Sequence, residues 1–288
     1  MLKIFTDVLD PFLWGLFPII RKFERKYRNF KYEFVMGGLI GDYEEFLPQN
    51  FREKNSLELG NKILYDMYRA TSTITNIKGF SSPPELFTED YKSSYPLDKY
   101  FLSVKEIDED KSKAYMRKIL EEAIIFEKNI FKMDVQKDIV KDFGLDFEEF
   151  IFNYENSHDI FLQNRMETFD YRIKKFPGFL ITENNRVLQN IMDFSKIEEF
   201  LLENLDLEER EEKLLEAEKI LNYINSYELV LKDEIKIVFG EDKELEELIK
   251  EGRIKIREVN SFEILEINDK KLVGYSRLFN FKNFKNLL

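Results

Sequence analysis

The sequence predicts an α/β fold in which one small sheet is completed across a large helical insertion, followed by a small α+β unit. Three observations predict it. Strand, helix and strand alternate over residues 3–36, helical patterns fill residues from about 56 to 174, and a hairpin follows at residues 179–188. With 288 residues, of which 43% are hydrophobic, the chain is long enough for one or two domains, and we expect two.

The chain opens with a strand, a helix and a second strand. Residues 3–6, Lys-Ile-Phe-Thr, indicate a short buried strand. Asp10 and Pro11 then mark a helix start, because aspartate accepts hydrogen bonds at the N-cap and proline fits the first helical position. The helix is expected to run to about Tyr27. Residues 32–36 alternate and are rich in β-branched and aromatic side chains, which predicts the second strand.

The helical middle is interrupted where proline and glycine cluster, at residues 82–84, at residues 95–96 and at Gly144. Asp146 begins another helix, with Glu149 placed as in a capping box. Residues 179–182 and 186–188 then predict the hairpin, and a helix is expected from about 193 to 204.

The C-terminal part predicts a winged-helix-like unit. Its expected elements are an acidic helix at 208–224, a short strand at 228–231, helices at 232–239 and 243–250, and a hairpin at 253–257 and 262–266. We therefore expect a first domain at 1–205, an acidic unit at 206–268 and a basic, aromatic tail at 269–288. The tail is expected to fold back onto the acidic helices of its own chain, with docking on a partner as the alternative.

The net charge of −12 lies in one stretch, since residues 198–251 hold 19 acidic and 7 basic residues. Such a surface repels phosphate backbones and anionic lipids. We therefore expect no nucleic acid and no membrane as partner, and the winged-helix-like unit is interpreted as protein-binding or structural.

The chain has no cysteine and a single histidine. Disulfides, thiolate nucleophiles and Cys-ligated zinc are thereby excluded. His158 would have to be the base of any Ser-His-Asp site, and we assign it no role. No apolar run reaches the roughly 18 to 20 residues of a membrane span, and the start is too short for a signal peptide, so a cytoplasmic location is expected.

The segment from Phe5 to Gly15, FTDVLDPFLWG, is similar to the active-site segment of the DsbA-like and FrnE-like proteins, where Cys-x-x-Cys precedes Trp-Gly. The two cysteine positions hold Asp10 and Leu13. Three later segments also resemble this family: residues 32–39 its second strand and Gly-Gly turn, 144–146 a helix junction, and 176–179 the cis-proline loop. The resemblance covers residues 1–205 and implies a thioredoxin-like fold with a cis bond before Pro177. Without cysteine, thiol-disulfide exchange is excluded.

The resemblance implies a binding surface at the degenerate active-site position, formed by Asp10, Pro11, Leu13, Trp14, Phe176 and Pro177, with Asp7 as an accessory residue. The dipole at the start of the first helix favours an anion, so we expect Asp10 to be ionised and to be a poor acid or base at neutral pH. A helix cap for Asp10 and a core position for Trp14 are the simpler interpretations. Leu13 is expected to make the rim of the surface apolar, and thioredoxin-fold sites bind extended backbone beside the cis-proline without sulfur.

These features predict a non-catalytic bacterial adaptor or chaperone that binds a protein partner, with no cofactor and no metal. Asp7 and Asp10, without histidine, match a hard-cation site only loosely. The layout of the two units resembles the YjbH/SpxH-type adaptors, which implies a link to regulated proteolysis or stress response. The alternative is a glutathione-dependent transferase or isomerase of the kappa-class type. A carboxylate at Asp10 would repel the glutathione thiolate, which argues against that alternative.

Overall fold

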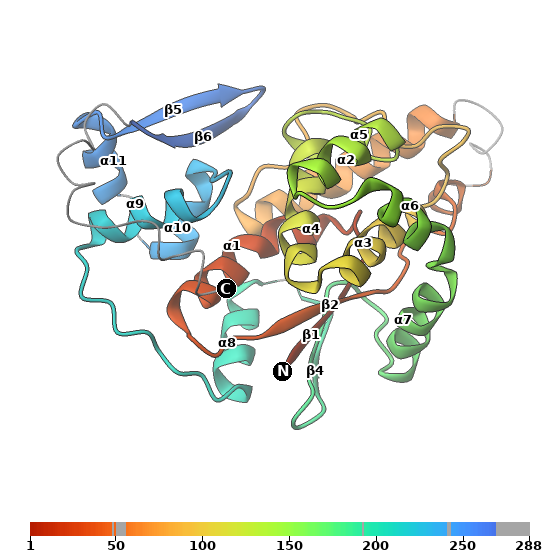
Figure 1. Ribbon diagram of the computed structural model, residues 1–288, viewed down its shortest axis with the longest axis horizontal. Coiled ribbons are helices and arrows are strands. Elements are labelled where there is room, and N and C mark those ends of the chain that lie inside the picture. The colour runs from red at the N-terminus through yellow and green to blue at the C-terminus, as the bar shows by residue number, and fades with distance from the viewer. Residues whose placement is uncertain (48, 50–55, 192, 241–242, 269–288) are drawn as a thin grey trace. The chain divides into compact units, whose positions relative to one another are not determined.

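The computed structural model describes residues 1–47, 49, 56–191, 193–240 and 243–268. The chain divides between Arg210 and Glu211 into two compact units (Figure 1). The predicted basic tail at 269–288 lies outside the described residues. Within the described ranges, no helix combines the length and the apolar character needed to cross a membrane.

The first unit is built on a four-stranded mixed sheet with the order β2-β1-β3-β4. β1 (Leu2–Thr6) pairs in parallel with β2 (Tyr32–Met36), and helix α1 (Pro11–Lys26) joins them. On its other side β1 pairs antiparallel with β3 (Gly178–Ile181), which turns into β4 (Arg186–Leu188). The opening strand, helix and strand, and the hairpin that completes the sheet, are confirmed.

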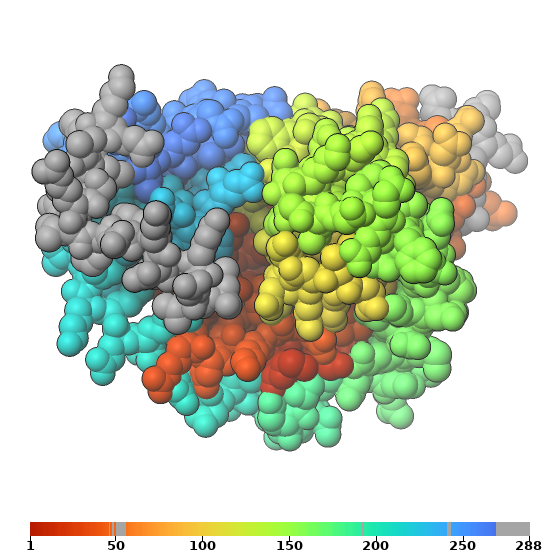
Figure 2. All heavy atoms as spheres, in the orientation of Figure 1, coloured from red at the N-terminus to blue at the C-terminus, as the bar shows by residue number. Residues whose placement is uncertain are grey.

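A long run of helices separates β2 from β3, as the sequence predicts. In chain order the elements are η1 (Tyr43–Phe46), α2 (Ser56–Thr75), α3 (Tyr95–Ile107), α4 (Glu109–Ile124), α5 (Met133–Asp142), α6 (Phe147–Asn156) and α7 (His158–Asp170). Figure 2 shows the yellow and green helices of this insertion packed together over much of the visible face of the unit. Gly144 has a φ of +64°, which ends α5, and the Asp146 carboxylate accepts from the Glu149 amide to start α6.

Helix α8 (Ser195–Asn204) follows the hairpin, close to the predicted range. The predicted helix at 208–224 is wrong in its first half, because helix α9 (Glu216–Ser226) begins eight residues later. Residues 208–210 instead pair with the end of α1: the Arg28 amide donates to the Glu208 carbonyl, and the Arg210 amide donates to the Lys26 carbonyl. Salt bridges from Lys26 to Glu209 and from Arg28 to Glu208 accompany these backbone bonds.

The second unit contains α9, α10 (Lys232–Phe239), α11 (Lys243–Lys250) and an antiparallel hairpin of β5 (Ile254–Val259) and β6 (Phe262–Ile267). Buried residues from the helices and the hairpin form its core, among them Ile224, Ile235 and Leu248. The expected strand at 228–231 is reduced to one bridge, between Leu231 and Ile264. Helices followed by a hairpin match the predicted α+β unit.

Candidate functional site

The turn from β1 into α1 is closed by the side chain of Asp10. One carboxylate oxygen accepts from the Phe12 amide at 3.0 Å, and the other accepts from the Thr6 hydroxyl at 2.9 Å. The Asp10 carbonyl accepts the first helical bond, from the Leu13 amide. Asp10 is therefore the N-cap of α1, as the sequence predicts, and it is only 1% exposed.

A second buried carboxyl, Asp7, joins three segments around this turn. Its oxygens accept from the Leu9 amide at 2.8 Å, from the Leu39 amide at 2.6 Å and from the Ser94 hydroxyl at 2.5 Å. Asp98, in α3, adds a third buried carboxyl, which accepts from the Val8 amide at 3.0 Å. The loop before α1 is thus held by carboxyls from both sides, and Asp7 is too deeply buried to contact a ligand.

Burial decides the protonation of these three groups. It raises the pKa of Asp10 to about 7, against an ordinary value of 3.8, and the neighbouring charge of Asp7 acts in the same direction. The hydrogen bonds from Phe12 and Thr6 oppose this shift only in part. The expectation that Asp10 stays ionised at neutral pH is therefore wrong, because the hydrogen bonds from Phe12 and Thr6 offset less free energy than the loss of water costs. Burial also raises the pKa of Asp7, and it raises the pKa of Asp98 well above its ordinary value, helped by the charge of Asp7.

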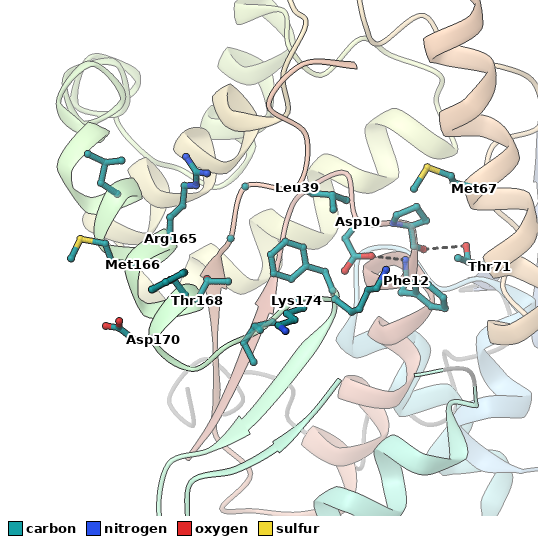
Figure 3. Close-up of a pocket in the computed structure, with 18 of the residues that line it drawn as sticks. Asp10, Phe12, Leu39, Met67, Thr71, Arg165, Met166, Thr168, Asp170 and Lys174 are labelled. Carbon is teal, nitrogen blue, oxygen red and sulfur yellow. Dashed lines mark hydrogen bonds between the residues drawn. The ribbon is translucent and has the colours of Figure 1, made fainter. Parts of the chain in front are cut away.

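Asp10 lies at the floor of an open cleft of about 1100 Å³ (Figure 3). Its walls come from the start of α1, the Gly37–Leu39 loop, α2, α7 and the segment before β3. The lining is mainly apolar and includes Pro11, Phe12, Met67, Ile74 and Phe176. Within the described residues, no group of three or more His, Asp or Glu side chains is arranged to hold a metal ion.

One wall of the cleft is an exposed apolar stripe on α7, formed by Leu162, Met166 and Phe169. These side chains are 39%, 64% and 81% exposed, although they are spaced at helical intervals on one face. Sequence reasoning missed this α7 stripe, because α7 carries apolar residues on more than one face. The sequence signal that was available is the pair of apolar residues at positions 162 and 166, one helical turn apart.

The residues predicted for the binding surface separate into two groups. Asp10, Pro11 and Phe176 line the cleft together. Leu13 and Trp14 do not, since both are buried in the core beneath α1. The expectation that Leu13 forms an apolar rim is therefore wrong: in the first turn of α1 its position faces the protein interior.

Trp14 has a structural role, in agreement with the simpler interpretation. Its indole N–H donates to the Lys78 carbonyl at 2.7 Å, and the Arg117 guanidinium lies 3.9 Å from its ring centroid. The peptide bond between Phe176 and Pro177 is cis, as the resemblance implied. Pro177 itself is buried, whereas Phe176 shares the cleft with Asp10. His158, the first residue of α7, is exposed and does not line the cleft.

Comparison with solved structures shows which known folds the chain resembles. A disulfide isomerase-like protein from Nitrosomonas europaea aligns with a TM-score of 0.54 and 14% identity, over 70% of this chain and 97% of that protein. The cytosolic disulfide reductase DsbM from Pseudomonas aeruginosa, in its structure with GSH, aligns with a TM-score of 0.51 and 15% identity, over 70% and 96% of the two chains. No family model matches the sequence, and no curated protein matches it. The chain therefore has a DsbA-like thioredoxin fold that contains no cysteine.

Proposed function

We propose that the chain is a non-catalytic binding protein, an adaptor or chaperone, that holds an extended peptide segment of a partner in the cleft above Asp10. The α7 stripe is the observation that carries this proposal. Large apolar side chains that stay exposed along an open, preformed groove are typical of protein and peptide docking sites. Methionines at Met67 and Met166 suit such a surface, because the flexible thioether adapts to different side chains.

The chemistry of the lining residues favours binding over catalysis. A nucleophile or general acid has to reach the reacting atom, and the carboxyl group of Asp10 is 1% exposed and engaged as a helix cap. Asp7 and Asp98 lie deeper still. The cleft thus supplies shape and apolar area, with polar groups that fix its walls.

We also propose a location and a partner class for the protein. A chain that resembles the YjbH/SpxH-type adaptors, and whose fold is shared with a reductase described as cytosolic, is proposed to act in the bacterial cytoplasm. The partner we propose is a protein subject to regulated proteolysis or a stress response.

The test is binding of fluorescent, unstructured apolar peptides to the full chain, followed by anisotropy. The double variant Met166→Glu/Phe169→Glu places two charges on the α7 stripe and is expected to weaken binding about tenfold or more, as loss of a binding hot spot does. Phe152→Glu is the matched control, because Phe152 is 65% exposed on α6 and does not line the cleft. Absence of peptide binding, or equal losses in both variants, would contradict the proposal.

A glutathione-dependent transferase or isomerase is the second candidate, and the protonation of Asp10 weakens the argument against it. With a pKa of about 7, Asp10 is neutral in a large fraction of molecules at neutral pH, so the expected repulsion of a glutathione thiolate is reduced. Calorimetric titration with glutathione tests this candidate. Saturable binding at physiological concentration that Asp10→Ala abolishes would place it ahead of the adaptor.

A further inference from the structure

Three of the five charged side chains on the cleft lining are cationic. Arg165, Lys174 and Lys175 border the cleft, against a single acid, Asp170, besides the buried Asp10. Because the net charge of −12 lies in residues 198–251, the rest of the chain is balanced, and this positive excess is local to the cleft. In the part of the chain that the structure describes, none of the three cations forms an ion pair.

We propose that the occupant of the cleft is an apolar peptide segment that carries acidic residues, with its carboxylates placed against Arg165, Lys174 and Lys175. This inference rests on the proposed function and adds the charge of the ligand to it. The α7 stripe supplies the apolar contacts, and the cations supply register and selectivity. Charge complementarity of this kind sets partner choice more than it sets affinity.

Among the described residues, the contacts that hold Arg165 in position are with aromatic rings and not with a carboxylate. Its guanidinium lies 4.9 Å from the ring centroid of Tyr95 and 5.9 Å from that of Phe161. Aromatic packing fixes the plane of the group and leaves its N–H donors for a ligand. Arg165 follows Leu162 by three residues and precedes Phe169 by four, so its side chain neighbours the α7 stripe, and all three residues line the cleft (Figure 3).

Lys174 and Lys175 approach the cleft from a different element. They lie in the segment before β3, and the backbone of this segment is anchored where the Lys174 amide donates to the Gln189 side chain at 2.7 Å. Both lysines are exposed. Cations from two elements, α7 and the β3 segment, thus border one apolar groove, an arrangement that suits acidic residues spaced along an extended chain.

The test uses peptides with the same apolar centre and flanks of glutamate, glutamine or lysine, each titrated into the full chain and followed by anisotropy. The glutamate peptide is expected to bind about tenfold more tightly than the lysine peptide, and its affinity is expected to fall as salt is added. Lys174→Glu/Lys175→Glu is expected to remove this preference. The control Lys31→Glu/Lys141→Glu reverses two exposed lysines outside the cleft and is expected to keep it.

The outcomes separate this inference from the proposed function. Equal affinity for all three peptides, lost in Met166→Glu/Phe169→Glu, overturns the inference and leaves the proposed function standing. Failure of every peptide to bind overturns both. A preference for glutamate that survives in Lys174→Glu/Lys175→Glu also overturns the inference, because the selectivity then arises elsewhere.

Discussion

Replacing Asp10 with asparagine is expected to stabilise the protein at alkaline pH. In the folded chain Asp10 has a pKa of about 7, whereas the unfolded chain has the ordinary value of 3.8. Between about pH 4 and pH 7 the folded state therefore binds more protons than the unfolded state, and stability falls as the pH rises. Each pH unit within this window lowers the free energy of unfolding by about 1.4 kcal/mol. Over the whole window, Asp10 alone lowers it by about 4 kcal/mol.

Asparagine keeps the contacts of the cap and removes the charge. Its side-chain oxygen accepts from the Phe12 amide, and asparagine caps helices as well as aspartate does. The amide nitrogen then faces Thr6 and donates to its hydroxyl oxygen. The Thr6 hydroxyl can still donate to the Asp7 carbonyl, which lies at 3.4 Å. Arg165, Lys174 and Lys175 border the open cleft above Asp10, but the buried titratable groups that interact with it are acidic: Asp7 and the hydroxyl of Tyr68 from α2. None of these buried groups supplies a positive charge that the substitution would leave unpaired.

The assay is guanidinium denaturation from about pH 5 to pH 8, with the fluorescence of Trp14, the sole tryptophan, as a probe of the first unit. Asp10→Asn is expected to be more stable than the parent by up to about 4 kcal/mol at pH 8, with a difference that shrinks toward pH 5. Asp146→Asn is the control, since Asp146 caps α6 in an exposed position. Parallel pH profiles for Asp10→Asn and the parent would refute the reasoning, because Asp10 would then carry the same charge in both states.

The remaining predictions concern the walls of the cleft. Gly37→Ala places a Cβ 2.0 Å from the tip of the Phe176 ring, so peptide affinity is expected to fall. In the Phe176→Ala background, Gly37→Ala is expected to have no effect on peptide affinity, and a double-mutant binding cycle measures this. Gly38→Ala is expected to lower the free energy of unfolding by about 1 to 3 kcal/mol in denaturant titrations, because Gly38 has a φ of +71° and its Cβ would lie 2.9 Å from Tyr95. Binding of the acidic peptide is expected to tighten from about pH 8 to pH 6, as Asp10 takes up a proton beneath the ligand, and anisotropy on Asp10→Asn is expected to give a flat profile.

Elements set by local signals could be predicted from the sequence. The start of α1 follows from Asp10 and Pro11, and β2 follows from alternation, so both have the expected bounds. The start of α9 could not be predicted this way. Residues 208–210 lie in a strongly acidic stretch whose sequence predicts a helix. Their backbone groups instead pair with the end of α1, which is distant in sequence. Tertiary pairing therefore overrides the local preference there.

The candidate site was predicted in position but not in chemistry. The sequence places Asp10 at a helix N-terminus, and the local field of a helix favours a carboxylate. Whether the Asp10 carboxylate stays hydrated depends on how deeply α2, α3 and the cleft walls bury it. These elements come from residues far along the chain. The protonation of Asp10 therefore depends on the tertiary structure and could not be predicted from the local sequence. The cationic border of the cleft is likewise assembled from α7 and the segment before β3.

The way α7 is anchored explains why its apolar stripe remains exposed. The side-chain oxygen of Asn164 accepts from the Met36 amide at the end of β2 at 3.0 Å, and Lys3 of β1 forms a salt bridge with Glu167. Phe161 is buried on the same side of the helix. One face of α7 is thus fixed to the sheet by polar and apolar contacts, which leaves the α7 stripe directed into the cleft. A helix held in this manner loses little entropy when a ligand covers its other face, and such preorganisation favours binding.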